Sequence, residues 1–269
     1  MRKRGAGLGL AGPPALVLGL TLAYPLALIL GTARRGAGVL ASGAFLAALL
    51  HTVAIALAAT AGAMSLALVF ALVLAFAPFP GGRACARVAE TTIALPSFLI
   101  ALALTFAYGS AGVVNGALAA LFGPGGPRVD FLYSAWGVIL AEITIYMPFV
   151  LRPLLATFDA IDRAQIEIAA GLGAGAGVIL RRVILPAAVP ALLAGGSLCL
   201  LLTLNEFGVV LFIGAKGVIT LPVLVYDKAI QEFDYPAACA IASVNIGLAL
   251  ALFATYRLLL GRLAHDAVH

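Results

Sequence analysis

The chain has 269 residues, of which 64% are hydrophobic and only 10% are charged. A soluble globular domain carries roughly a quarter charged residues, so the mean hydropathy of +1.15 indicates an integral membrane protein and excludes a sizeable water-soluble domain. The formal net charge of +5 is not accompanied by a basic stripe with interleaved aromatic residues, which argues against nucleic acid as a partner and for basic loops that orient a membrane protein.

Six apolar runs are each long enough to cross the hydrocarbon core, which takes about 20 helical residues. The first run follows the basic start MRKR, is longer than a signal-peptide core and precedes a poor cleavage site, so we expect an uncleaved span. Residues 36–50 are apolar but rich in small side chains, and we expect a short interfacial helix there. The expected spans are residues 13–31, 51–77, 91–109, 134–152, 189–213 and 238–260.

The distribution of basic residues predicts the orientation. With a cytoplasmic N-terminus, eleven of the 16 Lys and Arg residues lie inside, which is the side where they are enriched in membrane proteins. The five outside are Arg34, Arg35, Arg128, Lys216 and Lys228. We therefore expect an all-α membrane protein with one transmembrane domain over residues 1–269. It would lie in a bacterial-type inner (plasma) membrane, with both termini and residues 153–188 in the cytoplasm.

Two groups of residues give no sign of metal or disulfide chemistry. Three cysteines (Cys85, Cys199 and Cys239) lie far apart, and we expect them to be small core residues. The histidines do not cluster with carboxylates, and the chain has no HExxH or GxSxG motif, which argues against an intramembrane enzyme.

The segment 157–188, between spans four and five, is charged and rich in glycine. We expect a helix over residues 157–170 with Asp159 and Asp162 near its start, since carboxylates stabilise the positive end of a helix. A second helix, VILRRVIL over 178–185, should stop at Pro186. The glycines that separate the two helices are Gly171, Gly173, Gly175 and Gly177.

This helix–turn–helix has two interpretations from its residues alone. It can lie on the membrane as an amphipathic hairpin, or it can dock to a cytoplasmic partner. A phosphate-binding loop is excluded because there is no GxxxxGK[ST], and a GxGxxG register from Gly171 has Ala176 in its last position.

The same segment resembles the cytoplasmic loop of the membrane subunits of binding-protein-dependent ABC importers. Their pattern is E-A-A, three residues, G, nine residues, I-x-L-P. Here the triplet is Glu167-Ile168-Ala169, Gly173 follows the glutamate by six residues, and Val183-Ile184-Leu185-Pro186 closes the pattern at the required spacing. Ile168 and Val183 are apolar replacements of the family residues. The resemblance covers the chain from the second span to the end.

The resemblance implies that residues 157–188 couple the membrane domain to a separate ATPase. Glu167 would be the polar anchor, Gly173 the turn and Pro186 the exit toward span five. It implies a non-catalytic subunit without a cofactor of its own, since ATP and Mg²⁺ would bind to the partner ATPase. The implied partners are an ABC ATPase dimer, a second identical or paralogous permease subunit, an extracytoplasmic substrate-binding protein and the lipid bilayer. The implied coupling residues are Glu167, Ile168, Ala169, Gly173, Val183, Leu185 and Pro186.

Two acidic residues fall inside expected spans four and five. A carboxylate at the bilayer centre costs about 2.5–3.5 kcal/mol on insertion scales, so such residues face a cavity or a partner; the alternative is a structural hydrogen bond between helices. Pro96 and Pro148 can free backbone carbonyls within spans three and four. The candidate residues of a translocation path are Glu142, Asn205, Glu206 and Phe207.

The stretch NEFGVVLFIGAKGVITLP, residues 205–222, resembles 2-aminoethylphosphonate permeases. Sulfate and molybdate permeases resemble it less, because they carry glycine where this chain has Asn205. The resemblance implies import of 2-aminoethylphosphonate, with sulfate, molybdate or another small solute as alternatives. The expected spans hold no central Lys or Arg, and Glu206 would suit an ammonium group. A rival from a different class is a proton-coupled secondary transporter that uses Glu142 and Glu206 as relay groups and needs no ATPase.

Overall fold

The computed structural model describes residue 14 and residues 16–77, 79–123 and 125–266, with the side chains of Arg83 and residues 259–266 excepted. The two termini themselves, for which a cytoplasmic position is expected, lie outside these residues. The described residues are helical almost throughout and contain no β-strand. As predicted, six helical stretches are long and apolar enough to cross a membrane: Leu16–Ala41, Gly43–Phe76, Ser97–Phe122, Ala135–Asp159, Ala176–Leu204 and Tyr235–Leu258.

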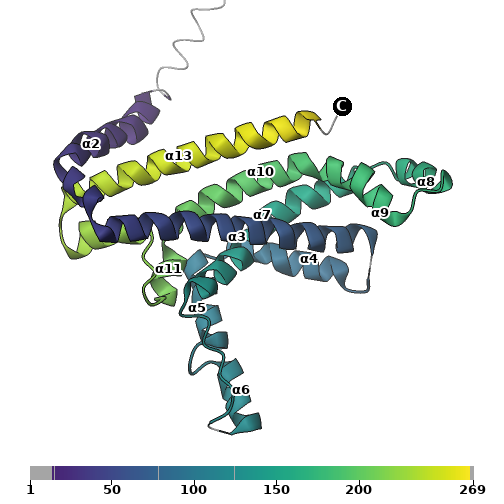
Figure 1. The fold of residues 1–269 in the computed structure, drawn as a ribbon, viewed down its shortest axis with the longest axis horizontal. Coiled ribbons are helices and arrows are strands. Elements are labelled where there is room, and N and C mark those ends of the chain that lie inside the picture. Colours follow the sequence, from purple (N-terminus) through teal and green to yellow (C-terminus); the bar gives the residue numbers. More distant parts are fainter. Residues whose placement is uncertain (1–13, 15, 78, 124, 267–269) are drawn as a thin grey trace, which may run out of the picture. The chain divides into compact units, whose positions relative to one another are not determined.

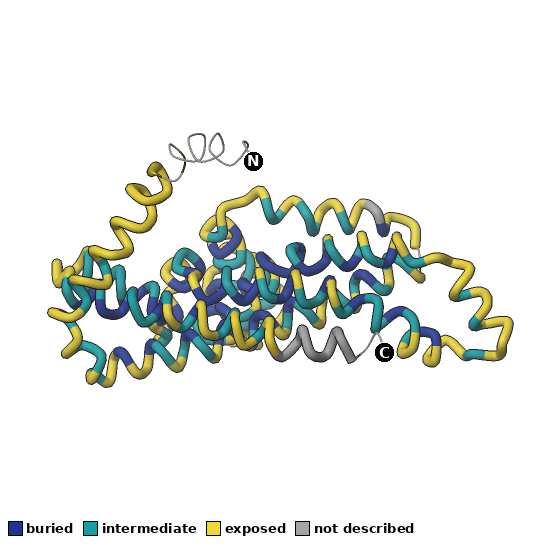
Figure 2. Tube along the Cα trace, turned by 90° about the horizontal axis from the view of Figure 1, so that it is seen from above, coloured by how far each residue is buried: buried dark blue, intermediate teal, exposed yellow. Residues whose placement is uncertain are grey.

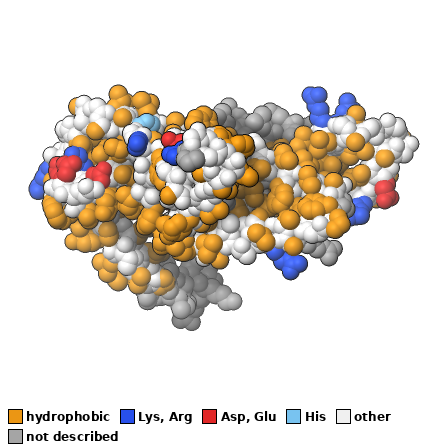
Figure 3. Space-filling model, turned by 90° about the horizontal axis from the view of Figure 1, so that it is seen from below, with side chains coloured by type: hydrophobic (Ala, Val, Ile, Leu, Met, Phe, Trp, Pro, Cys, Tyr) orange, Lys and Arg blue, Asp and Glu red, His pale blue; other side chains and the backbone are white. Residues whose placement is uncertain are grey.

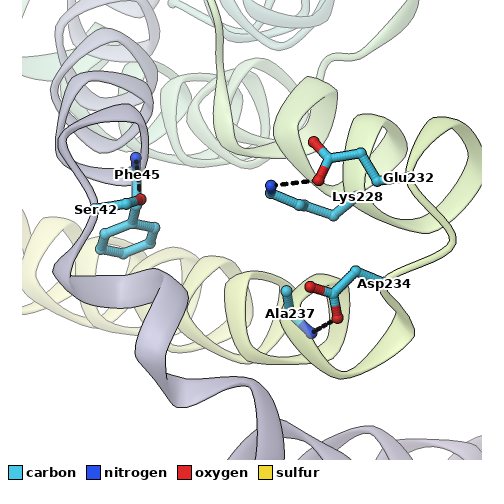
Figure 4. Close-up of polar contacts among 6 residues, drawn as sticks. All are labelled: Ser42, Phe45, Lys228, Glu232, Asp234 and Ala237. Carbon is cyan, nitrogen blue, oxygen red and sulfur yellow. Dashed lines mark hydrogen bonds and ion pairs between the residues drawn. The ribbon is translucent and has the colours of Figure 1, made fainter.

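Residues 19–41 of the first span form three helical segments. The π-helix η1 (Gly19–Ala23), the α-helix α2 (Tyr24–Ala33) and the 3₁₀-helix η2 (Arg34–Ala41) follow one another without a break. Ser42 then turns the chain, and its hydroxyl oxygen accepts the Phe45 N–H at 3.2 Å at the start of α3 (Gly43–Phe76), as Figure 4 shows. The short interfacial helix expected over 36–50 is therefore wrong: its first part belongs to η2 and its second to α3.

The chain divides into two compact units. The first comprises residues 1–49 and 221–248, and it holds α12 (Leu221–Tyr226), the π-helix η5 (Asp227–Gln231) and the first part of α13 (Tyr235–Asp266). Its core residues are Phe45, Ala48, Leu221, Leu224 and Ile241.

The turn from η5 into α13 is tied by polar contacts on both sides of Phe233. Lys228 and Glu232 form an ion pair at 2.7 Å, and the Asp234 carboxylate accepts the Ala237 N–H at 3.1 Å (Figure 4). Phe233 between them has a φ of 56° and is 70% exposed. The turn is thus held by its flanks rather than by burial of the ring.

The second unit comprises residues 50–220 and 249–269. After α3 it contains α4 (Gly82–Thr91), the 3₁₀-helix η3 (Thr92–Ala94), α5 (Ser97–Tyr108), α6 (Val113–Phe122) and α7 (Ala135–Asp159). The expected third span, 91–109, is therefore displaced toward the C-terminus. Pro96, with φ −56° and ψ 138°, precedes α5 instead of interrupting a helix. Leu95 before it is extended, as is typical of a residue that precedes proline.

Helices α7 and α10 (Leu185–Leu204) lie side by side at the centre of the second unit (Figure 1). Gly195 permits their close approach, since a Cβ there would lie 2.7 Å from the Val150 Cα and 3.0 Å from the Phe149 carbonyl oxygen. Buried side chains of both helices fill the space around this contact: Val150, Leu151, Leu154, Leu200 and Leu204.

The fifth span also differs from the expectation of 189–213. The helix runs without interruption from Ala176 to Leu204 through α9 (Ala176–Ile179), the π-helix η4 (Leu180–Ile184) and α10. Pro186 does not stop it, because the chain widens just before the proline: the Leu185 N–H donates to the Leu180 carbonyl, five residues back. The helix ends at Leu204, and the short α11 (Gly208–Ile213) follows a break.

The surface has the character of a membrane protein. Figure 3 shows hydrophobic side chains over most of the visible face, with charged side chains confined to a few places. Soluble monomers rarely expose large contiguous apolar areas. The exposed leucines of the first span, such as Leu16, Leu20 and Leu22, therefore suit a lipid environment.

Candidate functional site

Helix α7 ends at Asp159, and the chain leaves helical geometry before α8 (Arg163–Gly171) begins. The Asp162 carboxylate accepts the Ala164 N–H at 3.0 Å and thereby caps α8. The single helix expected over 157–170 is therefore wrong: α7 ends at Asp159, and Asp162 caps the start of the next helix.

The turn after α8 is centred on Gly173, whose φ is +85°. The Gly173 N–H donates to the Ala170 carbonyl at 2.9 Å, and the Ala174 N–H donates to the Ala169 carbonyl at 3.0 Å. These two bonds form a Schellman motif, which needs a left-handed residue at this position and satisfies the last carbonyls of α8. Helix α9 then starts after Gly175, so the described backbone is a helix, a tight turn and a second helix.

The exposed face of this loop carries large apolar side chains beside a charged one. Ile168 on α8 is 64% exposed, and Leu172, four residues later and directly after the helix, is 83% exposed; Glu167 beside Ile168 is also exposed. Residues four apart share one helix face. A cavity of about 310 Å³ lies beside Glu167 and is lined by Phe158, Arg163 and Ile166 among others. In Figure 2 the loop is almost entirely exposed, at the right of the view.

The residues of the family spacing fall into two groups in the structure. Glu167, Ile168 and Gly173 are exposed on α8 and its turn, with Ala169 half-buried between them. The closing residues Val183, Leu185 and Pro186 are half-buried in the continuous helix that leads into α10.

A second polar cluster surrounds Glu206, which is only 6% exposed and lies in the break between α10 and α11. Its Oε1 accepts the Ser97 hydroxyl at 3.0 Å and the Val209 N–H at 2.9 Å. Its Oε2 accepts the hydroxyl of Tyr146. The expectation that Glu206 lies inside a membrane-spanning helix is wrong, because the helix has ended two residues earlier.

The other path candidates are placed differently. Glu142 is 1% exposed on α7, one turn before Tyr146, and its Oε2 makes no hydrogen bond to the part of the chain that the structure describes. Asn205 is exposed and donates from Nδ2 to the Leu201 carbonyl at 2.8 Å, while Phe207 is half-buried. The two glutamates are thus enclosed, and Asn205 is the path candidate that reaches the surface.

Ser97 and Tyr146 did not stand out in the sequence. Tyr146 lies one turn from Glu142 on the same helix face, so a search for hydroxyls beside intramembrane carboxylates could have found it. Ser97 is 109 residues from Glu206 in the sequence, and no sequence pattern indicates their contact. Cys85 is exposed rather than in the core, whereas Cys199 is buried and Cys239 is half-buried. Among the described residues no three metal-binding side chains come together.

Comparisons with known proteins agree with this architecture. Residues 67–267 match the family model described as "Binding-protein-dependent transport system inner membrane component". The chain is 56% identical, over 93% of its length and 90% of the relative's, to PhnU of Salmonella paratyphi A, named as a 2-aminoethylphosphonate transport system permease protein. It is 31% identical to the sulfate transport system permease protein CysT of Salmonella typhimurium, over 75% of this chain and 71% of that one.

A solved structure has the same fold. A chain of a bacterial ABC transporter involved in the import of the acidic polysaccharide alginate superimposes with a TM-score of 0.78, at 20% sequence identity, covering 97% of this chain and 96% of that one. The family match, the relatives and the six apolar helices agree. The chain belongs to the family of inner-membrane components of binding-protein-dependent transport systems and is a permease subunit of an ABC transporter.

Proposed function

We propose that this chain is the transmembrane subunit of an ATP-driven importer that carries 2-aminoethylphosphonate across the inner membrane. The observation that carries the proposal is the identity of 55–56% over 93% of the chain with relatives named for this solute. The identity to sulfate permeases is only 31–33% and covers less of the chain. Sulfate or molybdate therefore remains the weaker alternative.

The exposed loop supports the proposed coupling to a separate ATPase dimer, which would bind ATP and Mg²⁺. Ile168 and Leu172 offer an exposed apolar face, and Glu167 offers an exposed charged side chain beside it. An exposed apolar face with a polar rim suits a protein–protein interface. The Schellman turn at Gly173 sets the angle between the two helices that would enter the ATPase, and this chain itself would catalyse nothing.

The helices on either side of the loop would transmit a movement of the loop into the membrane domain. The loop leaves from the end of α7 and returns through α9 and η4 into α10, and these long helices pack closely at Gly195. A displacement of the loop would therefore move α7 and α10 together. A second permease subunit would complete the path along surfaces such as that of Asn205, and an extracytoplasmic binding protein would deliver the solute.

The test is reconstitution of the complete transporter in proteoliposomes with the loaded binding protein outside and ATP inside. We expect uptake of 2-aminoethylphosphonate that requires ATP, survives a protonophore and is not displaced by excess sulfate. Uptake of sulfate with no uptake of the aminophosphonate would replace the solute and keep the class. Uptake driven by a pH gradient without ATP would show a secondary transporter and refute the proposal.

A further inference from the structure

The Glu206 carboxylate is the point where three elements of the second unit meet. Ser97 from the first turn of α5, Tyr146 from the middle of α7 and the backbone of Val209 at the start of α11 all donate to it. Both carboxylate oxygens are therefore engaged by the protein. These three hydrogen bonds therefore link the three elements through one buried side chain.

The break between α10 and α11, which contains Glu206, needs contacts of this kind to fix the position of α11. Helix α10 ends at Leu204, so helix continuation does not determine the direction of α11. Glu206 satisfies an N–H group in the first turn of α11, as a capping residue does. Helix α11 also packs on α5, where the rings of Phe98 and Phe212 stack with centroids 5.2 Å apart. Helices α5 and α11 thus form a pair that the Tyr146–Glu206 contact joins to α7.

The opposite end of α7 and α10 carries the exposed loop. Only residues 160–162 separate α7 from α8, and α9 continues through η4 into α10. The close contact at Gly195 makes α7 and α10 one packed pair. This pair therefore has the loop at one end and the Glu206 contacts at the other.

We propose that Glu206 is a positioning residue that joins the α5–α11 pair and the exposed Asn205 to the α7–α10 pair, and that it does not bind the carried solute. This inference rests on the proposed function and deepens it. Joining the helices requires acceptor oxygens of the right shape, whereas binding an ammonium group requires negative charge. Glutamine keeps an acceptor for Ser97 and Val209, and its amide can donate to the Tyr146 oxygen, so it separates the two roles.

The first experiment measures transport in proteoliposomes that contain the complete transporter. We expect Glu206→Gln to keep the KM for 2-aminoethylphosphonate within about threefold of wild type. Glu206→Ala should lower uptake per ATP hydrolysed by about tenfold or more, because it leaves three donors without an acceptor. Ser97→Ala should lower the same ratio by less. The control for Ser97→Ala is Ser65→Ala. The Ser65 hydroxyl donates to the Ala61 carbonyl within its own helix, so this variant should leave the ratio unchanged.

The second experiment needs no solute and measures how accessible residue 205, in the break between α10 and α11, is to a thiol reagent. The three cysteines of the chain are first replaced by Cys85→Ser, Cys199→Ala and Cys239→Ala. Asn205→Cys is then introduced as the single cysteine, and its rate of labelling by a maleimide is measured with and without ATP and vanadate bound to the ATPase. We expect ATP to change the labelling rate about threefold or more with Glu206 and with Glu206→Gln. The change should disappear with Glu206→Ala.

A rise in KM of about tenfold or more in Glu206→Gln would make Glu206 a ligand and overturn the inference. Full coupling in Glu206→Ala, or an ATP-dependent labelling change that persists in it, would also overturn it. Failure of the wild-type transporter to carry the aminophosphonate would instead refute the proposed function, and the labelling experiment would still decide the role of Glu206.

Discussion

Among the residues of the exposed loop, Gly173 has the backbone conformation that most restricts which residue types can replace it. A φ of +85° is readily adopted by glycine, tolerated by asparagine and unfavourable for other residues, most of all for β-branched ones. No atom lies within 4 Å of the position that its Cβ would take. The requirement for glycine is therefore one of backbone geometry, which a substitution series can measure.

The series Gly173→Asn, Gly173→Ala and Gly173→Val should lower solute-stimulated ATP hydrolysis in that order. Each step adds strain to the turn, at about 1–2 kcal/mol for a residue with a Cβ in the left-handed region. Gly173→Arg, which adds bulk at the same place, should abolish transport and ATPase coupling while membrane insertion persists. The measurement is ATP hydrolysis by the reconstituted transporter with and without loaded binding protein.

Gly177→Ala is the matched control, because Gly177 lies in helical α9 and also has open space at its Cβ. Alanine is favoured over glycine inside a helix, so coupling should be unchanged. Equal activity across the Gly173 series would mean that the turn can adopt another conformation when it couples.

At the scale of the elements, periodicity and hydropathy predicted six spans because apolar length alone decides whether a helix can cross a membrane. They did not predict where the helices break. The Pro186 pattern looked like a stop, yet a π-helical turn carries the helix through it. The break after Leu204 lies in a sequence of high hydropathy, and contacts from α5 and α7 hold it. Such contacts depend on tertiary packing, which one segment of sequence does not contain.

The close contact of α7 and α10 leads to a prediction at this scale. Gly195→Ala should destabilise the permease by about 1–3 kcal/mol, because the added methyl group meets the backbone at Val150 and forces the helices apart. The unfolding midpoint of the purified transporter in detergent measures the effect.

Gly247→Ala provides the comparison, since Gly247 lies in α13 and no atom lies within 4 Å of the position that an added methyl group would take. Its midpoint should stay the same or rise slightly. A Gly195→Ala protein as stable as wild type would show that α7 and α10 can separate without cost, which would also remove the basis for treating them as one pair.

For the whole molecule, the family and the helix count agree with the sequence, whereas the orientation in the membrane is an expectation from charge alone. The excess of Lys and Arg places Arg163 in the cytoplasm and Lys216 outside. Both residues are exposed in the structure, which makes them suitable for labelling. The coupling proposal requires this orientation, because ATP is available only in the cytoplasm.

In a cysteine-free background, Lys216→Cys should react with a membrane-impermeant maleimide in intact cells. Arg163→Cys should react only in inverted vesicles or after permeabilisation. A permeant maleimide that labels both variants in intact cells provides the control for accessibility. Labelling of Arg163→Cys from outside would invert the topology and exclude the exposed loop as the contact with an ATPase.

The capped start of α11 also bears on solute discrimination. The Val209 N–H already donates to the chain's own Glu206 carboxylate, so this helix start offers an incoming oxyanion no vacant donor at Val209. Neither a phosphonate nor a sulfate would gain a hydrogen bond from this N–H. Selection between them must then be made elsewhere, and the external binding protein, which meets the solute first, is where a specificity-changing substitution should be sought.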